Sequence, residues 1–370
     1  MVSGTGEMLE KFTWRKKKKP FSAWQIELTT RCPLLCKMCI RSERNDWHYH
    51  DMPLEDFKKI SPYLKDVQNV VLEGWGESLL HPNLVDCIQL VKREGPEVGF
   101  VTSGKGLTQD RASELVRAGL DFVGFSLAGT TAETHDAIRV NSRLPEIVDA
   151  IHSIREEKAR QSRHLPRMHI VFLMVKDNIH EVPALPAFAK ETGIEEVVLV
   201  NICHAINAWQ EKQRVFSYGE GDDEFEKMIR RAESDAQKLN IKLRRPSLSV
   251  MDVPVCGEDP LRNLYISTDG EVSPCVFLYP PINSPFKRIF SGKEYWLGRV
   301  GFGNIFRESF PRIWENKNYV QFRNCFVQRR KRFRELDQLV WNSIRPVDSQ
   351  NIDLPEAPEP CMTCHKMLSL

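Results

Sequence analysis

The chain has no long hydrophobic run and almost no net charge. No stretch of its 370 residues approaches the ~20 apolar residues of a membrane span. A formal charge of +2 gives no overall field that would favour nucleic acid. We therefore expect contact with neither a membrane nor a nucleic acid. A basic run, Lys16 to Lys19, has no apolar stretch behind it, so residues 1–22 are expected to form a basic tail and not a signal peptide.

Cysteine is too scarce for a disulfide scaffold. The chain has 10 cysteines, far below the density of small secreted domains. Seven of them fall in tight or motif-like spacings, which in an intracellular chain is typical of metal binding. The sequence therefore predicts a cytoplasmic protein with reduced thiols and metal sites.

Short β-rich runs alternate with amphipathic helical patterns from about residue 23. The runs are 23–29, 69–74, 97–102, 122–127, 168–174 and 195–201. Such alternation predicts parallel strands joined by helical crossovers. Six repeats suit a partial α/β barrel, because a full eightfold barrel needs roughly 250 residues. The apolar periodicity of 222–241 predicts one more helix, which we expect to bridge to a second domain.

The composition changes after about residue 250, where prolines, glycines and short runs dominate. The segment LYISTDGEVSPC predicts a hairpin with Asp269 and Gly270 at its turn. We therefore expect two domains, an α/β barrel over 23–245 and a smaller domain over 246–370.

Three cysteines follow the first predicted strand within eight positions: Cys32, Cys36 and Cys39. In barrel-like α/β proteins the chemistry lies at the carboxyl ends of the strands, so these thiols are placed where a cofactor would bind. Three thiolates can hold three irons of a [4Fe–4S] cluster and leave the fourth open to a small molecule. A zinc site completed by a distant ligand is the alternative.

This C-x3-C-x2-C segment resembles the signature of radical S-adenosylmethionine (SAM) enzymes. In that family the open iron binds the amino and carboxylate groups of SAM, and one electron cleaves SAM to methionine and a 5'-deoxyadenosyl radical. The radical then abstracts a hydrogen atom from a substrate. The resemblance implies an enzyme with a partial (β/α)6 barrel that uses a [4Fe–4S] cluster and SAM.

The segment EGWGESLLHP after the second strand resembles the family's Gly-Gly-Glu motif. The resemblance implies that Gly74, Gly76 and Glu77 hold the methionine amino group of SAM. Trp75 stands where the family usually has a small residue.

Later segments also resemble the family, in strand order. FVTSG places Ser103 in the third-strand loop, and FSLAGTTAETHDAIR places Ser126 and Arg139 where they would hold the methionine carboxylate or the ribose. An arginine fork suits a carboxylate because it can bind both oxygens. Met38 stands where an aromatic residue usually lies against the adenine, and a thioether can also pack on a ring.

A second cysteine set lies in the C-terminal region. It comprises Cys256, Cys275, Cys361 and Cys364. The arrangement resembles the auxiliary-cluster domains of radical SAM enzymes, called SPASM or, in the shorter form, Twitch. After both sets only three cysteines remain, too few for a second auxiliary cluster, so the resemblance implies one fully ligated auxiliary [4Fe–4S] cluster. The spacing most resembles that of the alcohol dehydrogenase of butirosin biosynthesis. A zinc ribbon, or Cys325 in place of one ligand, are the alternatives.

A fully ligated cluster has no open iron, so its expected role is to accept an electron from the substrate radical. The outcome would be a two-electron oxidation, which needs a base, and the candidates are Tyr279, His204 and Asp269.

About twenty residues precede the first strand, which is few for a peptide-recognition domain, so a small-molecule or carbohydrate substrate is expected first. A peptide maturase forming crosslinks, thioethers or epimers, and a non-catalytic metal-binding scaffold, are the alternatives. The resemblance implies a flavodoxin- or ferredoxin-type electron donor.

The two cysteine sets predict the iron content. Anaerobically reconstituted protein should carry about eight irons per chain, as two [4Fe–4S] clusters require. Replacing Cys32, Cys36 and Cys39 together with alanine should leave about four. Colorimetric iron analysis and zinc analysis measure both values, and stoichiometric zinc with only four irons in the unmutated protein would contradict the second cluster.

Overall fold

The computed structural model describes residues 19–219, 223–342 and 353–370. Most of the predicted tail, residues 1–18, lies outside the described residues. Phe21 and Ser22, which we expected at the end of the tail, already belong to the first strand.

Six parallel strands form the central sheet and follow one another in sequence order, as predicted. They are β1 (Phe21–Ile26), β2 (Val67–Val71), β3 (Glu97–Thr102), β4 (Phe122–Leu127), β5 (Arg167–Met174) and β6 (Glu196–Asn201). Parallel neighbours need a crossover between each pair of strands, and the intervening amphipathic segments supply it. The predicted partial (β/α)6 barrel is therefore confirmed.

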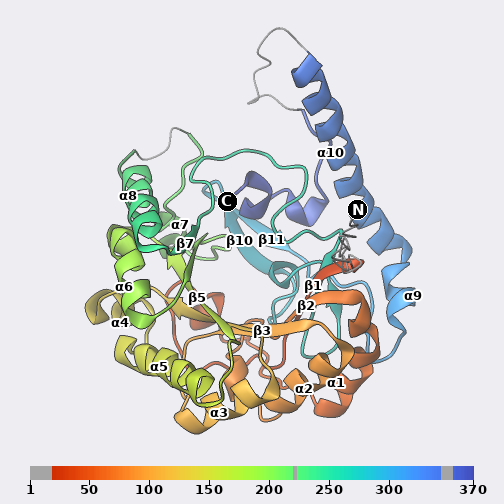
Figure 1. The fold of residues 1–370 in the computed structure, drawn as a ribbon. Coiled ribbons are helices and arrows are strands. Elements are labelled where there is room, and N and C mark those ends of the chain that lie inside the picture. Colours follow the sequence, from red (N-terminus) through yellow and green to blue (C-terminus); the bar gives the residue numbers. More distant parts are fainter. Residues whose placement is uncertain (1–18, 220–222, 343–352) are drawn as a thin grey trace, which may run out of the picture.

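Helices cover the outer face of this curved sheet (Figure 1). They are α1 (Leu54–Ile60), α2 (Leu84–Glu94), α3 (Gln109–Ala118), α4 (Ala132–Ile138), α5 (Leu144–Arg160), α6 (Leu185–Thr192) and α8 (Asp223–Leu239). The short helix α7 (Ala208–Lys212) lies instead beside the first cysteine loop, where Gln210 donates to the Lys37 carbonyl oxygen at 3.2 Å. Short 3-10 turns lie at Ile40–Glu43, Ser61–Asp66, Ser78–Leu80, Ile179–Ala184, Val276–Leu278, Glu359–Cys361 and His365–Leu368. α2 and α3 end at Gly95 and Gly119, whose φ angles of 91° and 87° allow the left-handed cap.

The sheet is longer than the sequence predicted. β7 (Lys242–Arg244) extends it beyond β6, and β8 (Asn263–Ile266) pairs in parallel with β1 on the opposite side. β9 (Val272–Ser273) completes the predicted hairpin with β8, and Gly270 at its turn has φ 85°. The described sheet thus has nine strands in the order β7-β6-β5-β4-β3-β2-β1-β8-β9.

The expected role of the helix over 222–241 is wrong. α8 packs against α6 and the 3-10 turn at Ile179–Ala184, and it leads directly into β7 of the same sheet. It is therefore part of the barrel's outer layer and not a bridge. The domain boundary at 245/246 remains a proposal, because β8 and β9 continue the barrel sheet after it.

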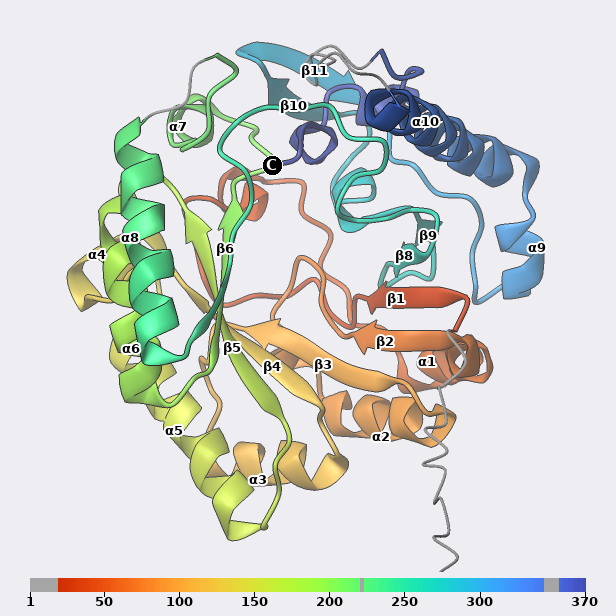
Figure 2. The same cartoon turned by 45° about the horizontal axis from the view of Figure 1, so that its top comes forward.

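The C-terminal region after β9 divides between two places: its strand pair lies near the carboxyl end of β6, and its first helix lies beside β1. It contains the antiparallel pair β10 (Phe286–Phe290) and β11 (Lys293–Leu297), followed by α9 (Phe310–Trp314) and α10 (Lys317–Asn342). A bridge between Ala205 and Ile289 joins β10 to the segment after β6. Figure 2 shows the C-terminal end of the chain beside β6 and the β10–β11 pair.

An aromatic cluster fixes α9 to the first strand. Phe310 packs against Phe21 and Trp24 of β1, with ring centroids 5.4 Å and 4.6 Å apart. Trp314 packs edge-on against Phe21 at 5.0 Å. Because the three contacts join residues 286 to 293 positions apart in the sequence, they bind the C-terminal region to the barrel.

Replacing Phe310 with alanine should lower the free energy of unfolding by ~3–5 kcal/mol, the range for a buried phenylalanine. Phe310 is 6% exposed, so the truncation opens a cavity. Trp296, which is 64% exposed, is the control, and its replacement should change stability by no more than ~0.5 kcal/mol. Urea unfolding followed by fluorescence measures both. Equal effects would contradict the contribution of the buried Phe310 side chain to stability.

Candidate active site

The three cysteines after β1 lie in a pocket of about 400 Å³ at the carboxyl ends of the strands. The same pocket is lined by every residue that the family resemblance assigned to SAM. These residues are Met38, Gly74, Gly76, Glu77, Ser103, Ser126 and Arg139, beside Cys32, Cys36 and Cys39. The fold thus brings together residues from the loops after β1, β2 and β3, from β4 itself and from the end of α4.

The two glycines after β2 are required by a close approach to the first strand. A Cβ on Gly76 would lie 2.1 Å from the Thr29 carbonyl oxygen, and one on Gly74 would lie 2.4 Å from the Glu27 side chain. Glu27 also accepts a hydrogen bond from the Trp75 amide at 2.6 Å. Any side chain at either glycine would push this loop away from the cysteines.

Glu77 is held rigidly in the pocket wall. Its carboxylate accepts hydrogen bonds from the Thr102 hydroxyl at 2.7 Å and from the Ser103 amide and hydroxyl at 2.9 and 2.7 Å. The Glu77 amide donates to the Arg31 carbonyl oxygen at 2.8 Å. Because Arg31 directly precedes Cys32, the carboxylate and the first thiol are held at a fixed separation.

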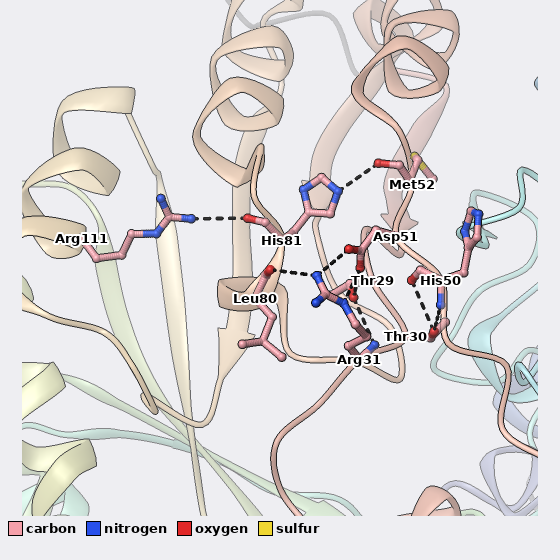
Figure 3. Close-up of polar contacts among 9 residues, drawn as sticks. All are labelled: Thr29, Thr30, Arg31, His50, Asp51, Met52, Leu80, His81 and Arg111. Carbon is pink, nitrogen blue, oxygen red and sulfur yellow. Dashed lines mark hydrogen bonds and ion pairs between the residues drawn. The ribbon is translucent and has the colours of Figure 1, made fainter. Parts of the chain in front are cut away.

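A polar network behind the pocket secures the same loop (Figure 3). Asp51 accepts hydrogen bonds from both Nε and Nη2 of Arg31, at 2.9 and 2.5 Å, and from the Thr29 hydroxyl at 2.5 Å. Arg31 also donates to the Leu80 carbonyl oxygen at 3.3 Å, on the loop that carries Glu77. Paired charged hydrogen bonds of this geometry hold orientation well, so the backbone before Cys32 has little freedom.

The cysteine loop is also bonded to the segment around Arg139. The Lys37 amide donates to the Ile138 carbonyl oxygen at 3.0 Å, and the Leu35 amide donates to Val140 at 2.9 Å. The Arg139 Nε is buried and has no hydrogen-bond partner in the protein. A buried guanidinium atom without a partner in a pocket fits the binding of an anionic group such as a carboxylate.

The second cysteine set lines one small, enclosed cavity. Its four members are Cys256, Cys275, Cys361 and Cys364. Burial, reinforced by the neighbouring thiols, raises the pKa of Cys256 to about 12 and the pKa of Cys275 and Cys361 well above the ordinary value. In the first set, burial raises the pKa of Cys39 to about 11. Cluster assembly must therefore release protons at both sites.

Cys325 does not line the second cavity. It lies on α10, where its thiol contacts the Gln321 carbonyl oxygen at 3.6 Å, although it is close enough to raise the pKa of Cys361. Within residues 19–219, 223–342 and 353–370, no three His, Cys, Asp or Glu side chains are grouped to hold a single metal ion. A [4Fe–4S] cluster spreads its ligands around a larger volume than a single ion does, and four thiols around one cavity fit it.

The three candidate bases fall in two different places. His204 lines the SAM-motif pocket, stacked between Phe277 and Phe286 at centroid distances of 6.2 and 5.9 Å. Both of its ring nitrogens are buried without a hydrogen-bond partner, and burial lowers its pKa well below the ordinary value. Tyr279 and Asp269 line a separate pocket on the other side of Glu27 and do not reach the cysteines.

Two charged residues that sequence reasoning missed also lie at the site. Glu73 and Lys366 both line the SAM-motif pocket, and Lys366 also lines the cavity of the second cysteine set. Lys366 forms an ion pair with Glu258 at 3.2 Å. The position of Glu73, directly before the glycine loop, was a signal available in the sequence. For Lys366 the sequence contains no such signal, because its position at the pocket depends on how the C-terminal segment packs against the barrel.

Two family models match the chain. The model of the Radical SAM superfamily matches residues 26–186, and the model of an iron–sulfur cluster-binding domain, SPASM, matches residues 256–365. The chain therefore contains a Radical SAM domain and a SPASM domain, in the order that the resemblance implied. This assignment implies that the two cysteine sets hold [4Fe–4S] clusters and that the first pocket binds SAM, as predicted. The iron–sulfur description favours a cluster over zinc at the second set.

Curated relatives carry out different modifications. The chain is 25% identical over 304 residues to the tungsten-containing aldehyde ferredoxin oxidoreductase cofactor-modifying protein of Pyrococcus furiosus, covering 80% of this chain and 82% of the relative. It is 30% identical over 179 residues to a PqqA peptide cyclase of Streptomyces rochei, covering 48% and 47%. It therefore spans only about half of that second relative.

Solved structures share the fold at low sequence identity. SuiB of Streptococcus suis bound to SAM has a TM-score of 0.59 at 13% identity, covering 82% of this chain and 68% of that one. Native anSMEcpe with bound AdoMet has a TM-score of 0.57 at 14% identity, covering 81% of this chain and 82% of that one. The butirosin-pathway protein BtrN also matches, at a TM-score of 0.44, which is too weak to support a common reaction.

Replacing Glu77 with alanine should weaken SAM binding by ~1.5–3 kcal/mol, the scale of a hydrogen bond to a charged group. The predicted partner is the methionine amino group, which would lose its acceptor. Isothermal titration of the reconstituted protein with SAM measures the affinity. Glu55→Ala, at a side chain 78% exposed on α1, should leave the affinity unchanged. Normal affinity in Glu77→Ala would refute the assignment of the glycine loop.

Proposed function

We propose that this protein is a radical SAM oxidoreductase that removes a hydrogen atom from its substrate and then oxidises the remaining radical through the auxiliary cluster. The observation that supports the proposal is a shared wall. Phe277 and Lys366 line both the SAM-motif pocket and the cavity of the second cysteine set. A substrate in the first pocket would therefore be separated from the second set by little more than these two side chains.

The shared wall is held from both sides. The buried Arg288 donates to the Phe277 carbonyl oxygen at 3.2 Å and to Pro360, just before Cys361, at 3.0 Å. Nδ1 of His365 lies 3.1 Å from the carbonyl oxygen of Cys203, two residues after the end of β6. These contacts keep the distance between the two sites short and constant, which an electron transfer between them needs.

The two cysteine sites would hold clusters with different roles. When bound, the first cluster supplies the electron that cleaves SAM, and the second, with no open iron, accepts an electron. Cys32, Cys36 and Cys39 would hold the first. The protein's own residues would orient SAM, through Glu77 and Arg139, and exclude water from the pocket.

A small molecule, including a carbohydrate, is the first candidate substrate. The pocket of about 400 Å³ falls in the range of small-ligand sites, and SAM must occupy part of it. A peptide is the second candidate, because one relative is named a PqqA peptide cyclase and SuiB was solved with its precursor peptide.

Hydrogen abstraction distinguishes the two candidates even while the substrate is unidentified. The reconstituted protein would receive SAM, a reductant and either the small-molecule or the peptide fraction of cells grown in heavy water. Deuterium in 5'-deoxyadenosine, measured by mass spectrometry, identifies the fraction that contains the hydrogen donor. Labelling by the small-molecule fraction alone supports the first candidate, and labelling by the peptide fraction alone supports the second.

We also propose a reducing, cytoplasmic location and a flavodoxin- or ferredoxin-type electron donor. All ten cysteines are free thiols, as cluster assembly requires. In the described part of the chain, no helix combines the length and apolarity needed to cross a membrane.

Replacing Cys364 with alanine should separate two activities. SAM cleavage and deuterium transfer should continue because the first cysteine set is intact, while the oxidised product should be lost with its electron acceptor. Product and labelled 5'-deoxyadenosine are quantified together by mass spectrometry. Cys325→Ser is the matched control and should keep both activities. A normal product yield in Cys364→Ala would eliminate the electron-acceptor role and indicate a redox-neutral reaction.

A further inference from the structure

One carboxylate at the centre of the site has no partner. Glu73 lies two residues beyond the end of β2 and lines the SAM-motif pocket. It also lines an adjoining groove of about 320 Å³, whose walls include Cys275, Glu258 and Phe277. Glu73 therefore stands between the first pocket and the second cysteine set.

The other carboxylates around it are occupied. Glu77 accepts hydrogen bonds from Thr102 and Ser103, and Glu258 is paired with Lys366. Of these three described carboxylates, Glu73 alone has no hydrogen bond or ion pair within the protein. Its oxygens are also absent from the buried atoms without a partner, so they remain open to the pocket. An enclosed carboxylate that keeps an open face is suited to a polar group of a ligand.

We propose that Glu73 accepts the hydroxyl proton of a substrate whose reacting carbon carries an alcohol group. This inference rests on the proposed oxidation and adds the residue that removes the proton and the kind of carbon that reacts. The C–H hydrogen atom goes to the 5'-deoxyadenosyl radical, the O–H proton goes to a Glu73 oxygen, and the remaining electron goes to the auxiliary cluster. The carbon–oxygen bond becomes a carbonyl, so atoms and electrons balance.

The electrostatic surroundings suit this role. Burial, with smaller contributions from the neighbouring carboxylates of Glu77 and Glu258, raises the pKa of Glu73 to about 8. A proton acceptor is most effective when its pKa lies near the working pH. His204 is the weaker candidate, because its ring nitrogens are enclosed and its pKa is lowered by burial.

The first test probes the carboxyl group itself. Dicyclohexylcarbodiimide reacts with protonated carboxyl groups in apolar surroundings, and reconstituted protein treated with it at neutral pH should carry an adduct at Glu73. Peptide mapping by mass spectrometry locates the adduct, which Glu73→Gln should abolish and the exposed-site control Glu133→Gln should retain. Labelling of Glu73 should fall as the pH rises through about 8, where its carboxyl group ionises and becomes able to accept a proton. Labelling of Glu73 that stays unchanged well above this pH would overturn the proposal, because the carboxyl group would then never become a proton acceptor.

The second test uses fully deuterated 2-propanol as the alcohol probe, with SAM and a reductant. The measured quantity is the acetone formed per deuterium-labelled 5'-deoxyadenosine. Glu73→Gln, which keeps the shape but cannot take the proton, should lower this ratio by ~100-fold, the usual contribution of a positioned base. Glu73→Asp should recover part of it, and Glu133→Gln should match the wild type.

The outcomes separate this inference from the proposed function. A wild-type ratio in Glu73→Gln overturns the role of Glu73, whatever Cys364→Ala does. A low ratio in Glu73→Gln with a wild-type ratio in Cys364→Ala supports Glu73 and overturns the auxiliary cluster as electron acceptor. No deuterium transfer by the wild-type protein overturns the claim that the pocket takes an alcohol carbon.

Discussion

The hydrogen bond from the Glu77 amide to the Arg31 carbonyl oxygen is the constraint on which the site depends. At 2.8 Å it joins the loop that carries the first cysteines to the loop that carries the predicted SAM acceptor. It can form only because Gly76 has no side chain, since a Cβ there would meet the Thr29 carbonyl oxygen. The ion pair of Arg31 with Asp51 then holds the first loop from behind. A backbone hydrogen bond thus determines where the cysteine loop and the Glu77 loop lie relative to each other. The thiols and the Glu77 carboxylate then supply the groups that would bind the cofactors.

The relation between the two cysteine sites follows from a different kind of contact. The first set lies on one loop, while the second is assembled from a strand pair and from a segment nearly a hundred residues later. Arg288 connects those distant pieces through two backbone carbonyl groups, one at Phe277 and one at Pro360. Its charge is buried, so losing either carbonyl partner would leave a polar group unsatisfied. Arg288 therefore fixes the positions of the residues that separate the two sites. A substrate would have to react beside these residues for its electron to reach the second cysteine set.

The sequence predicted the local elements well and the distant contacts poorly. The runs at 97–102 and 122–127 are β3 and β4 with the same bounds, because apolar runs ended by turn residues are a local signal. The cysteine spacing and the glycine loop are local as well, and they identified the residues of one pocket.

The pairing of β8 with β1 is not local, so hairpin residues expected in a separate domain extend the barrel sheet instead. The same limit explains Lys366, whose turn is held beside the barrel by the contact between His365 and the Cys203 carbonyl oxygen. Tyr279 and Asp269 were chosen by residue type, and only the fold shows that they line another pocket.

The position of β1 between β2 and β8 also has a consequence for synthesis of the chain. Ala23 pairs with Asn69 on one side and with Asn263 on the other. One edge of β1 can therefore be covered early, whereas the other waits for some 240 further residues. At the usual speed of translation that delay lasts tens of seconds. An uncovered edge strand readily pairs with other chains. The nascent polypeptide is thus most exposed to aggregation while it is still attached to the ribosome, and the high sequence separation of this pairing should make folding slow.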